Sequence, residues 1–124
     1  MEAIPNVHHD NDNHVNIARL LLAHEQIHIN QQNTRGVSAL HRACLKLSDS
    51  TAGIRLLLSD TRCDVTLQDD CGYTALMHAV EKLNVQHVTT NVRKVIEMLL
   101  IHPRKNGVNC LNRNNESALL LFLK

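Results

Sequence analysis

The chain has 124 residues, the size of a single domain, and its 44% apolar and 20% charged residues are ordinary for a globular protein. Aromatic residues make up only 2% and the formal net charge is +1, so neither stacking rings nor excess positive charge is available for nucleic-acid binding. The sequence contains no secretory signal and no run of roughly 18 apolar residues, which predicts an intracellular protein, cytoplasmic or nuclear, that does not bind membranes.

The first sixteen residues are polar and contain the densest group of potential metal ligands, His8-His9-Asp10-x-Asp12-x-His14. A closed zinc site needs about four ligands in fixed tetrahedral positions, and nothing in this segment fixes them. We predict a solvated tail or loop before Val15. A module that binds metal through histidine and cysteine is the weaker alternative.

One motif recurs along the chain. The dipeptides Ala3-Ile4, Ala39-Leu40 and Ala75-Leu76 lie 36 residues apart, and the last two stand in near-copies of one motif, at residues 36–44 and 72–80. A third start appears at Glu116-Ser117-Ala118-Leu119. Internal repetition at this period is typical of solenoids, whose extended surfaces favour binding over catalysis.

Each repeat is predicted to contain two helices. Ser38, Thr74 and Ser117 stand directly before the Ala-Leu starts, where a hydroxyl oxygen can accept from the first free N–H groups of a helix. The second helices are expected at residues 51–58 and 91–100, where apolar residues recur at helical spacing. The sequence therefore predicts a series of helical hairpins.

A short finger is expected between one helical hairpin and the next. Ile27 and Ile29, and again Cys63 and Val65, alternate with polar residues, which predicts short extended arms around a turn. Glycine adopts turn conformations that other residues resist, and it is available in both fingers, at Gly36 and Gly72. The finger should therefore resemble a hairpin.

The four cysteines are Cys44, Cys63, Cys71 and Cys110. No two of them form a Cys-x-x-Cys pair, and their placement follows the repeats and not a disulfide framework. We expect free thiols, with Cys44 on a buried helix face where cysteine acts as a small apolar residue.

The pattern Gly-x-Ser/Thr-Ala-Leu-His-x-Ala-Cys, followed by a leucine-rich helix and a finger, resembles the ankyrin repeat over about residues 15 to 119. The resemblance implies an all-α ankyrin-repeat solenoid of about three units and a partial one, at residues 1–32, 33–68, 69–111 and 112–124. The spacing exceeds the family's usual ~33 residues because the fingers are longer and because the third unit carries an insertion near residues 83–90.

The chain departs from the family pattern at several positions. Alanine replaces the usual proline, and only His41 keeps the motif histidine that in the family bonds the nearby hydroxyl and backbone. Residues 2–7 would have to serve as the first helix of the first unit, and the last unit ends with the apolar run Leu119–Leu123. Two hypotheses follow: a fragment of a larger ankyrin protein, either a scaffold or a host-directed effector with its activity in another domain, and self-association through this run.

In the family, finger tips and the exposed face of the first helices form a concave surface that binds partner proteins. Residue-by-residue transfer predicts such a surface here, with Tyr73 pointing away from the core. Its mixture of charges predicts a protein partner that is recognised through local charge pairs. The predicted partner-binding residues are Arg35, Val37, Arg42, Asp70, Tyr73, His78, Arg113 and Glu116.

No pattern in the sequence indicates catalysis. Cys44 and His41 are three residues apart on a predicted helix, but a buried thiol away from positive charge is inert. Glycine-rich phosphate loops, Gly-x-Ser-x-Gly and His-Glu-x-x-His are absent from the sequence. We expect a non-catalytic protein–protein interaction module with no catalytic residue, no cofactor and no bound metal.

Overall fold

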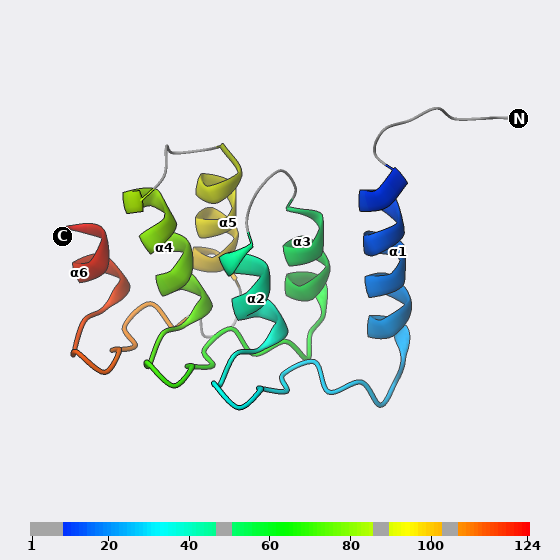
Figure 1. The fold of residues 1–124 in the computed structure, drawn as a ribbon, viewed down its shortest axis with the longest axis horizontal. Coiled ribbons are helices and arrows are strands. Elements are labelled where there is room, and N and C mark those ends of the chain that lie inside the picture. The colour runs from blue at the N-terminus through cyan, green and yellow to red at the C-terminus, as the bar shows by residue number, and fades with distance from the viewer. Residues whose placement is uncertain (1–8, 47–50, 86–89, 103–106) are drawn as a thin grey trace, which may run out of the picture.

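The computed structural model describes residues 9–46, 51–85, 90–102 and 107–124 (Figure 1). The described residues form α helices and no strand, so the predicted all-α class is confirmed. The helices are α1 (His9–Ala23), α2 (Ala39–Leu45), α3 (Ala52–Ser59), α4 (Ala75–Val85), α5 (Thr90–Leu100) and α6 (Ala118–Phe122).

The helices stack in two rows, with the finger loops along one edge (Figure 1). The first helices α2, α4 and α6 pack in sequence along one row, and the second helices α1, α3 and α5 pack along the other. The contacts α2 with α3 and α4 with α5 close each helical hairpin. This arrangement is a solenoid, in which each hairpin contacts only its neighbours.

The predicted hydroxyl caps start the first helices. The Ser38 Oγ accepts from the His41 N–H at 3.4 Å, the Thr74 Oγ1 from the Met77 N–H at 3.2 Å, and the Ser117 Oγ from the Leu120 N–H at 3.3 Å. Each cap satisfies a donor that has no partner inside its own helix. The second helices α3 and α5 begin within one residue of the predicted positions.

The core between the rows is built from aliphatic side chains, because the chain offers almost no rings. Leu76, Val95, Leu99 and Leu121 are completely or almost completely buried. Cys44 is fully buried as predicted, and burial raises the pKa of its thiol to about 12, which makes it unreactive. All four cysteines are free, as expected.

The N-terminal prediction is wrong from residue 9 onward. Residues 9–14, expected in a solvated tail or loop, form the first turns of α1. Helix extension costs little once the apolar segment at Ile17 has nucleated it, so polar residues can continue the helix outward. The first helix expected at residues 2–7 and half of the insertion, residues 86–89, lie outside the described residues.

No helix in the described part of the chain combines the length and the apolar character needed to cross a bilayer.

Candidate protein-binding surface

Each finger tip is built around one Asx side chain. The Asn33 Oδ1 accepts from the N–H groups of Arg35 at 2.8 Å and Val37 at 3.0 Å, which closes a tight turn. Asp69 and Asn112 repeat these bonds at the next two tips. Sequence reasoning missed this feature, although the Asx residues follow the same spacing as the helix starts and could have been found by it.

The backbone of each finger is bonded to the next finger. The Asp70 N–H donates to the Arg35 carbonyl at 2.9 Å, and the Arg113 N–H donates to the Cys71 carbonyl at 3.0 Å. Side-chain amides add a second link at two positions. Gln32 donates to the Gln68 carbonyl at 3.0 Å, and Gln68 to the Leu111 carbonyl at 2.8 Å.

The close approach of the fingers explains the two glycines. Gly36 and Gly72 have φ values of 76° and 79°, in the left-handed region that favours glycine. A Cβ at Gly36 would lie 2.9 Å from the Cα of Asp69, and one at Gly72 would lie 2.8 Å from the Cα of Asn112. Conformation and space therefore both require glycine, and the tips form one continuous row.

A basic pocket lies between the first finger tip and α2. Its volume is about 420 Å³, and Arg35, Val37 and Arg42 from the predicted surface line it together with Lys46. All three cations are exposed, and none of the described residues that line the pocket is a carboxylate. The structure thus brings three predicted residues together in a positively charged site.

Two other predicted residues form a half-buried cluster with Asp69. The Nε2–H of His78 donates to the Asp69 Oδ2 at 2.8 Å, and the Tyr73 ring lies 4.9 Å from the His78 ring. Burial alone would raise the pKa of Asp69, but the hydrogen bonds from His78 and from two backbone N–H groups hold it below its ordinary value. The prediction that Tyr73 points away from the core is wrong, because its side chain packs against the core.

The Tyr73 hydroxyl is also engaged, since it donates to the Glu81 Oε2 at 2.7 Å. Burial and the neighbouring Glu81 carboxylate raise the pKa of Tyr73 to about 12. Tyr73 and His78 are therefore held in place by neighbours, and only part of each ring remains available to a partner.

His41 links the first hairpin to the second. Its Nδ1 accepts from the Ser38 N–H at 3.2 Å and lies 2.8 Å from the Ser38 Oγ, while its Nε2 lies 2.8 Å from the Tyr73 carbonyl. A backbone N–H can only donate and a carbonyl can only accept, so Nδ1 is the acceptor and Nε2 carries the proton. Burial lowers the pKa of His41, which keeps the ring neutral in this role.

The His41, Asp69 and His78 side chains offer ligand atoms within 4.8 Å of one another, a spacing at which a metal could be held. The residues do not fit that use. The Nδ1 lone pair of His41 is taken by Ser38, and its Nε2 is protonated toward Tyr73. The cluster is therefore a hydrogen-bonded link between hairpins.

The remaining predicted residues lie at the last two finger tips. Asp70 is exposed at the second tip and Arg113 at the last. Glu116 is bonded within the chain, because it accepts from the Asn112 amide at 3.0 Å and pairs with the Lys124 ammonium at 2.6 Å. The predicted residues therefore occupy three successive positions along the finger row and not one compact site.

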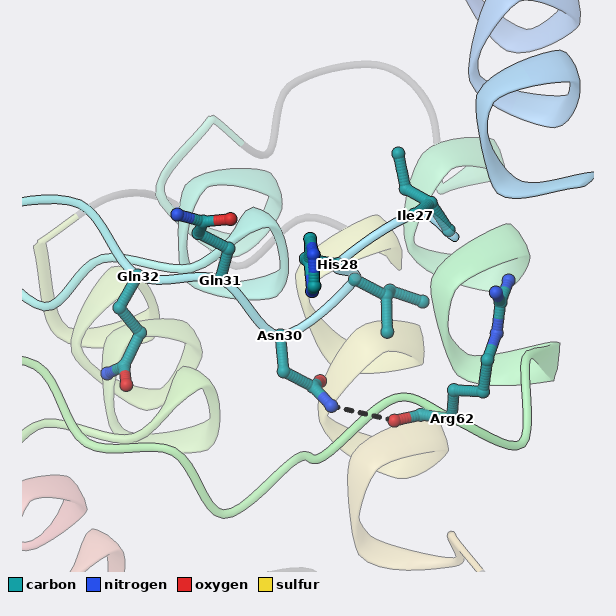
Figure 2. A pocket seen from close by; sticks show the side chains of 7 residues that line it. Ile27, His28, Asn30, Gln31, Gln32 and Arg62 are labelled. Atoms are coloured by element: carbon teal, nitrogen blue, oxygen red, sulfur yellow. Dashed lines mark hydrogen bonds between the residues drawn. The ribbon is translucent and has the colours of Figure 1, made fainter. Parts of the chain in front are cut away.

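A larger pocket of about 630 Å³ lies beside the first finger, between Ile27 and Arg62 (Figure 2). Figure 2 shows the Asn30 amide pointing at the Arg62 carbonyl, to which it donates at 2.8 Å. The Arg62 guanidinium donates to the carbonyls of Leu22 at 2.7 Å and His24 at 3.3 Å, at the end of α1 and just beyond it. These polar groups are used within the fold, and no sequence pattern indicated them.

The comparison with family models agrees with this geometry. A model described as ankyrin repeats (many copies) matches residues 20–79. Residues 20–79 therefore belong to the ankyrin-repeat family. No curated protein matches the chain. Ankyrin repeats generally mediate protein–protein interaction, and the family is typically non-catalytic.

The ankyrin geometry continues beyond the matched residues. The Asn112 turn, the Ser117 cap and the packing of α6 on α4 repeat the arrangement of the two preceding fingers and first helices. The glycine position of the last finger is filled by Asn115, whose φ is 61°, and asparagine is one of the few other residues that adopts this conformation readily.

Proposed function

We propose that this ankyrin-repeat chain is a non-catalytic module that binds a partner protein through its finger tips and the concave face of its first helices. The family's general role in protein–protein interaction supports the proposal. The bonds between successive fingers support it further, because a rigid row loses little conformational entropy when a partner binds.

The basic pocket is the observation that supports one kind of partner, a protein with an acidic segment. Arg35, Arg42 and Lys46 converge on it, and no carboxylate among the described lining residues neutralises them. Arginine forms strong paired hydrogen bonds with carboxylates, so the pocket suits an acidic segment of a protein. We place the acidic end of the partner at this finger and the rest of it along Asp70, Tyr73 and Arg113.

A charge reversal tests the proposal. Fluorescence anisotropy with a labelled oligoglutamate peptide should detect binding that weakens with salt, and Arg42→Glu should weaken it at least about tenfold. Arg93 on α5 is also exposed but lies in the row of second helices, so Arg93→Glu is the matched control and should leave binding unchanged.

Equal losses in both variants would indicate non-specific attraction and contradict the proposal. So would equal affinity of the wild-type protein for oligoglutamate and for an oligoserine peptide. Circular dichroism of both variants provides the control for folding.

The unit boundaries and the compartment are parts of the same proposal. The Asx turns begin at Asn33, Asp69 and Asn112, which supports units at residues 33–68, 69–111 and 112–124, with a first unit at 1–32.

Four free thiols support an intracellular location, cytoplasmic or nuclear, where cysteines stay reduced. Microscopy of a tagged chain would test the location.

A further inference from the structure

The polar side chains that line the basic pocket are all able to donate hydrogen bonds. Arg35, Arg42 and Lys46 carry donors and no acceptor. The Asn33 Oδ1 already accepts from two backbone N–H groups, at 2.8 and 3.0 Å, so its amide keeps only N–H donors for a ligand. The Thr34 hydroxyl can donate as well. The described lining therefore suits an anion that has several acceptor oxygens.

The three cations come from two elements and are close enough to line one pocket. Arg42 lies in the last turn of α2 and Lys46 is the residue that caps its end, four positions later and on the same face of the helix. Arg35 belongs to the finger tip. Among the described residues, none of the three has a partner in an ion pair. Like charges at this spacing repel one another, and a bound anion would remove that repulsion.

The next repeat carries the opposite charge at the equivalent positions. The residues 36 positions after Asn33, Thr34 and Leu45 are Asp69, Asp70 and Glu81. The fold of the repeat therefore does not require a basic lining, since the second finger closes the same turn without one. The donor set is a property of the first finger alone among these two.

The acidic second tip restricts the kind of anion that the first tip can bind. The Asp70 N–H donates to the Arg35 carbonyl at 2.9 Å, so the two tips are adjacent, and the Asp70 side chain is exposed. A run of several carboxylates that followed the finger row would meet Asp70 and be repelled. A phosphate monoester instead concentrates a charge of about −1.5 to −2 and three acceptor oxygens in one group, which fits inside the first tip.

We propose that the basic pocket binds a phosphorylated serine or threonine of the partner protein. The phosphate takes the place of the acidic end of the partner in the proposed function, on which this proposal rests. The guanidinium groups of Arg35 and Arg42 pair with phosphate oxygens through two N–H groups each, and the Lys46 ammonium adds a point charge. Val37 and Leu45, which also line the pocket, contact the carbon atoms of the phosphorylated residue.

Three labelled peptides test the proposal. They are identical except for one central residue among neutral neighbours, which is phosphoserine, glutamate or serine. By fluorescence anisotropy, the phosphoserine peptide should bind at least about tenfold more tightly than the glutamate peptide, and the serine peptide should not bind measurably. Arg35→Gln and Arg42→Gln should each weaken binding of the phosphoserine peptide at least about tenfold. Arg93→Gln on α5 is the matched control and should leave it unchanged.

A pH series provides a second measurement that needs no variant. The second pKa of a phosphate is about 6, so lowering the pH from about 7.5 to about 5.5 removes close to one negative charge. A glutamate side chain, with a pKa of about 4.3, stays ionised over this range. The affinity for the phosphoserine peptide should therefore fall at least about threefold relative to the affinity for the glutamate peptide, which reports any change in the protein itself.

Several results would overturn the proposal. Equal affinity for the phosphoserine and glutamate peptides would do so and would leave the proposed function intact, because an acidic segment would still bind. Unchanged binding in both Arg35→Gln and Arg42→Gln, with circular dichroism showing folded proteins, would place the phosphate elsewhere. Binding to vesicles that contain a phosphoinositide, without binding to the phosphoserine peptide, would identify a lipid headgroup as the ligand. The proposed function is tested separately, because the oligoglutamate experiment involves no phosphate.

Discussion

The first helices α2 and α4 begin with almost the same sequence but differ in what they offer to a partner. Arg42 in α2 and His78 in α4 are equivalent residues 36 positions apart. Arg42 is exposed, whereas His78 is half-buried, with its ring 5.7 Å from that of His41 on the preceding helix. His78 faces α2, the preceding first helix, and this neighbour is what covers it.

The same two helices hold their hairpins together in different ways. His41 bonds Ser38 and the next finger, while its counterpart Met77 has an apolar side chain that is completely buried. In the second hairpin the polar link is made one residue later, by His78 to Asp69. A first helix can therefore be held by a polar link or by apolar packing, each suited to its own surroundings, and only the residues that take part in neither are free to bind.

The largest effect on stability is expected at the finger glycine, a feature that the two hairpins share. Gly72→Ala should lower the free energy of unfolding by about 2 kcal/mol or more, because the new Cβ meets the next finger and φ is unfavourable. A Cβ added at Gly53 in α3 would meet no atom within 4 Å, so Gly53→Ala should stabilise by about 0.5 kcal/mol. Urea unfolding measures both, and equal effects would contradict the finger contact.

The second prediction concerns a substitution that makes the first hairpin resemble the second. His41→Met removes the bonds to Ser38 and to the Tyr73 carbonyl and should cost about 1 to 3 kcal/mol. Thermal unfolding followed by circular dichroism provides the measurement. An unchanged midpoint would mean that apolar packing replaces the histidine fully at this position, as it does at Met77.

The third prediction concerns a substitution that makes the second hairpin resemble the first. Asp69→Asn keeps an oxygen that can accept from the backbone as Asn33 does, but it removes the negative charge beside His78. The cost should be about 0.5 to 1 kcal/mol, because the pair is only partly buried. Asp69→Ala, which also removes the turn bonds, should cost clearly more. If the two variants were equally stable, the turn bonds would contribute nothing.

The smallest effect concerns pH. The pKa of His41 is lowered from 6.5 in the folded chain, so the unfolded chain binds more protons below that value and stability falls as pH decreases. The bond to the Tyr73 carbonyl opposes the effect of burial, which limits the loss. Between pH 7 and pH 5 the stability of the wild-type protein should fall more than that of His41→Met. If the stability of the two proteins fell in parallel, the lowered pKa of His41 in the folded chain would be contradicted.

The repeated features of the fold could be predicted from the sequence, and the contacts specific to one place could not. The helix caps and the glycines recur at a fixed spacing, and their chemistry is local. The start of α1 could not be predicted in this way, because its polar residues form helix as a continuation of an apolar segment.

The site was predicted only in part for a related reason. Arg35, Val37 and Arg42 were placed together by the repeat alignment. The same alignment could not show that His78 is bonded to Asp69 or that Glu116 is bonded to Lys124. Such pairs depend on side-chain conformations that spacing does not encode.

The guanidinium of Arg62 has a consequence for the order in which the chain opens. α1 packs chiefly on α3, and Arg62 holds the carbonyls of Leu22 and His24 at its end. α4 is held by α2, α5 and α6. Local opening follows the number of neighbours that must be released, so amide hydrogens of α1 should exchange with solvent well before those of α4. The two bonds from Arg62 are among the contacts that must break each time the first helix separates from the rest.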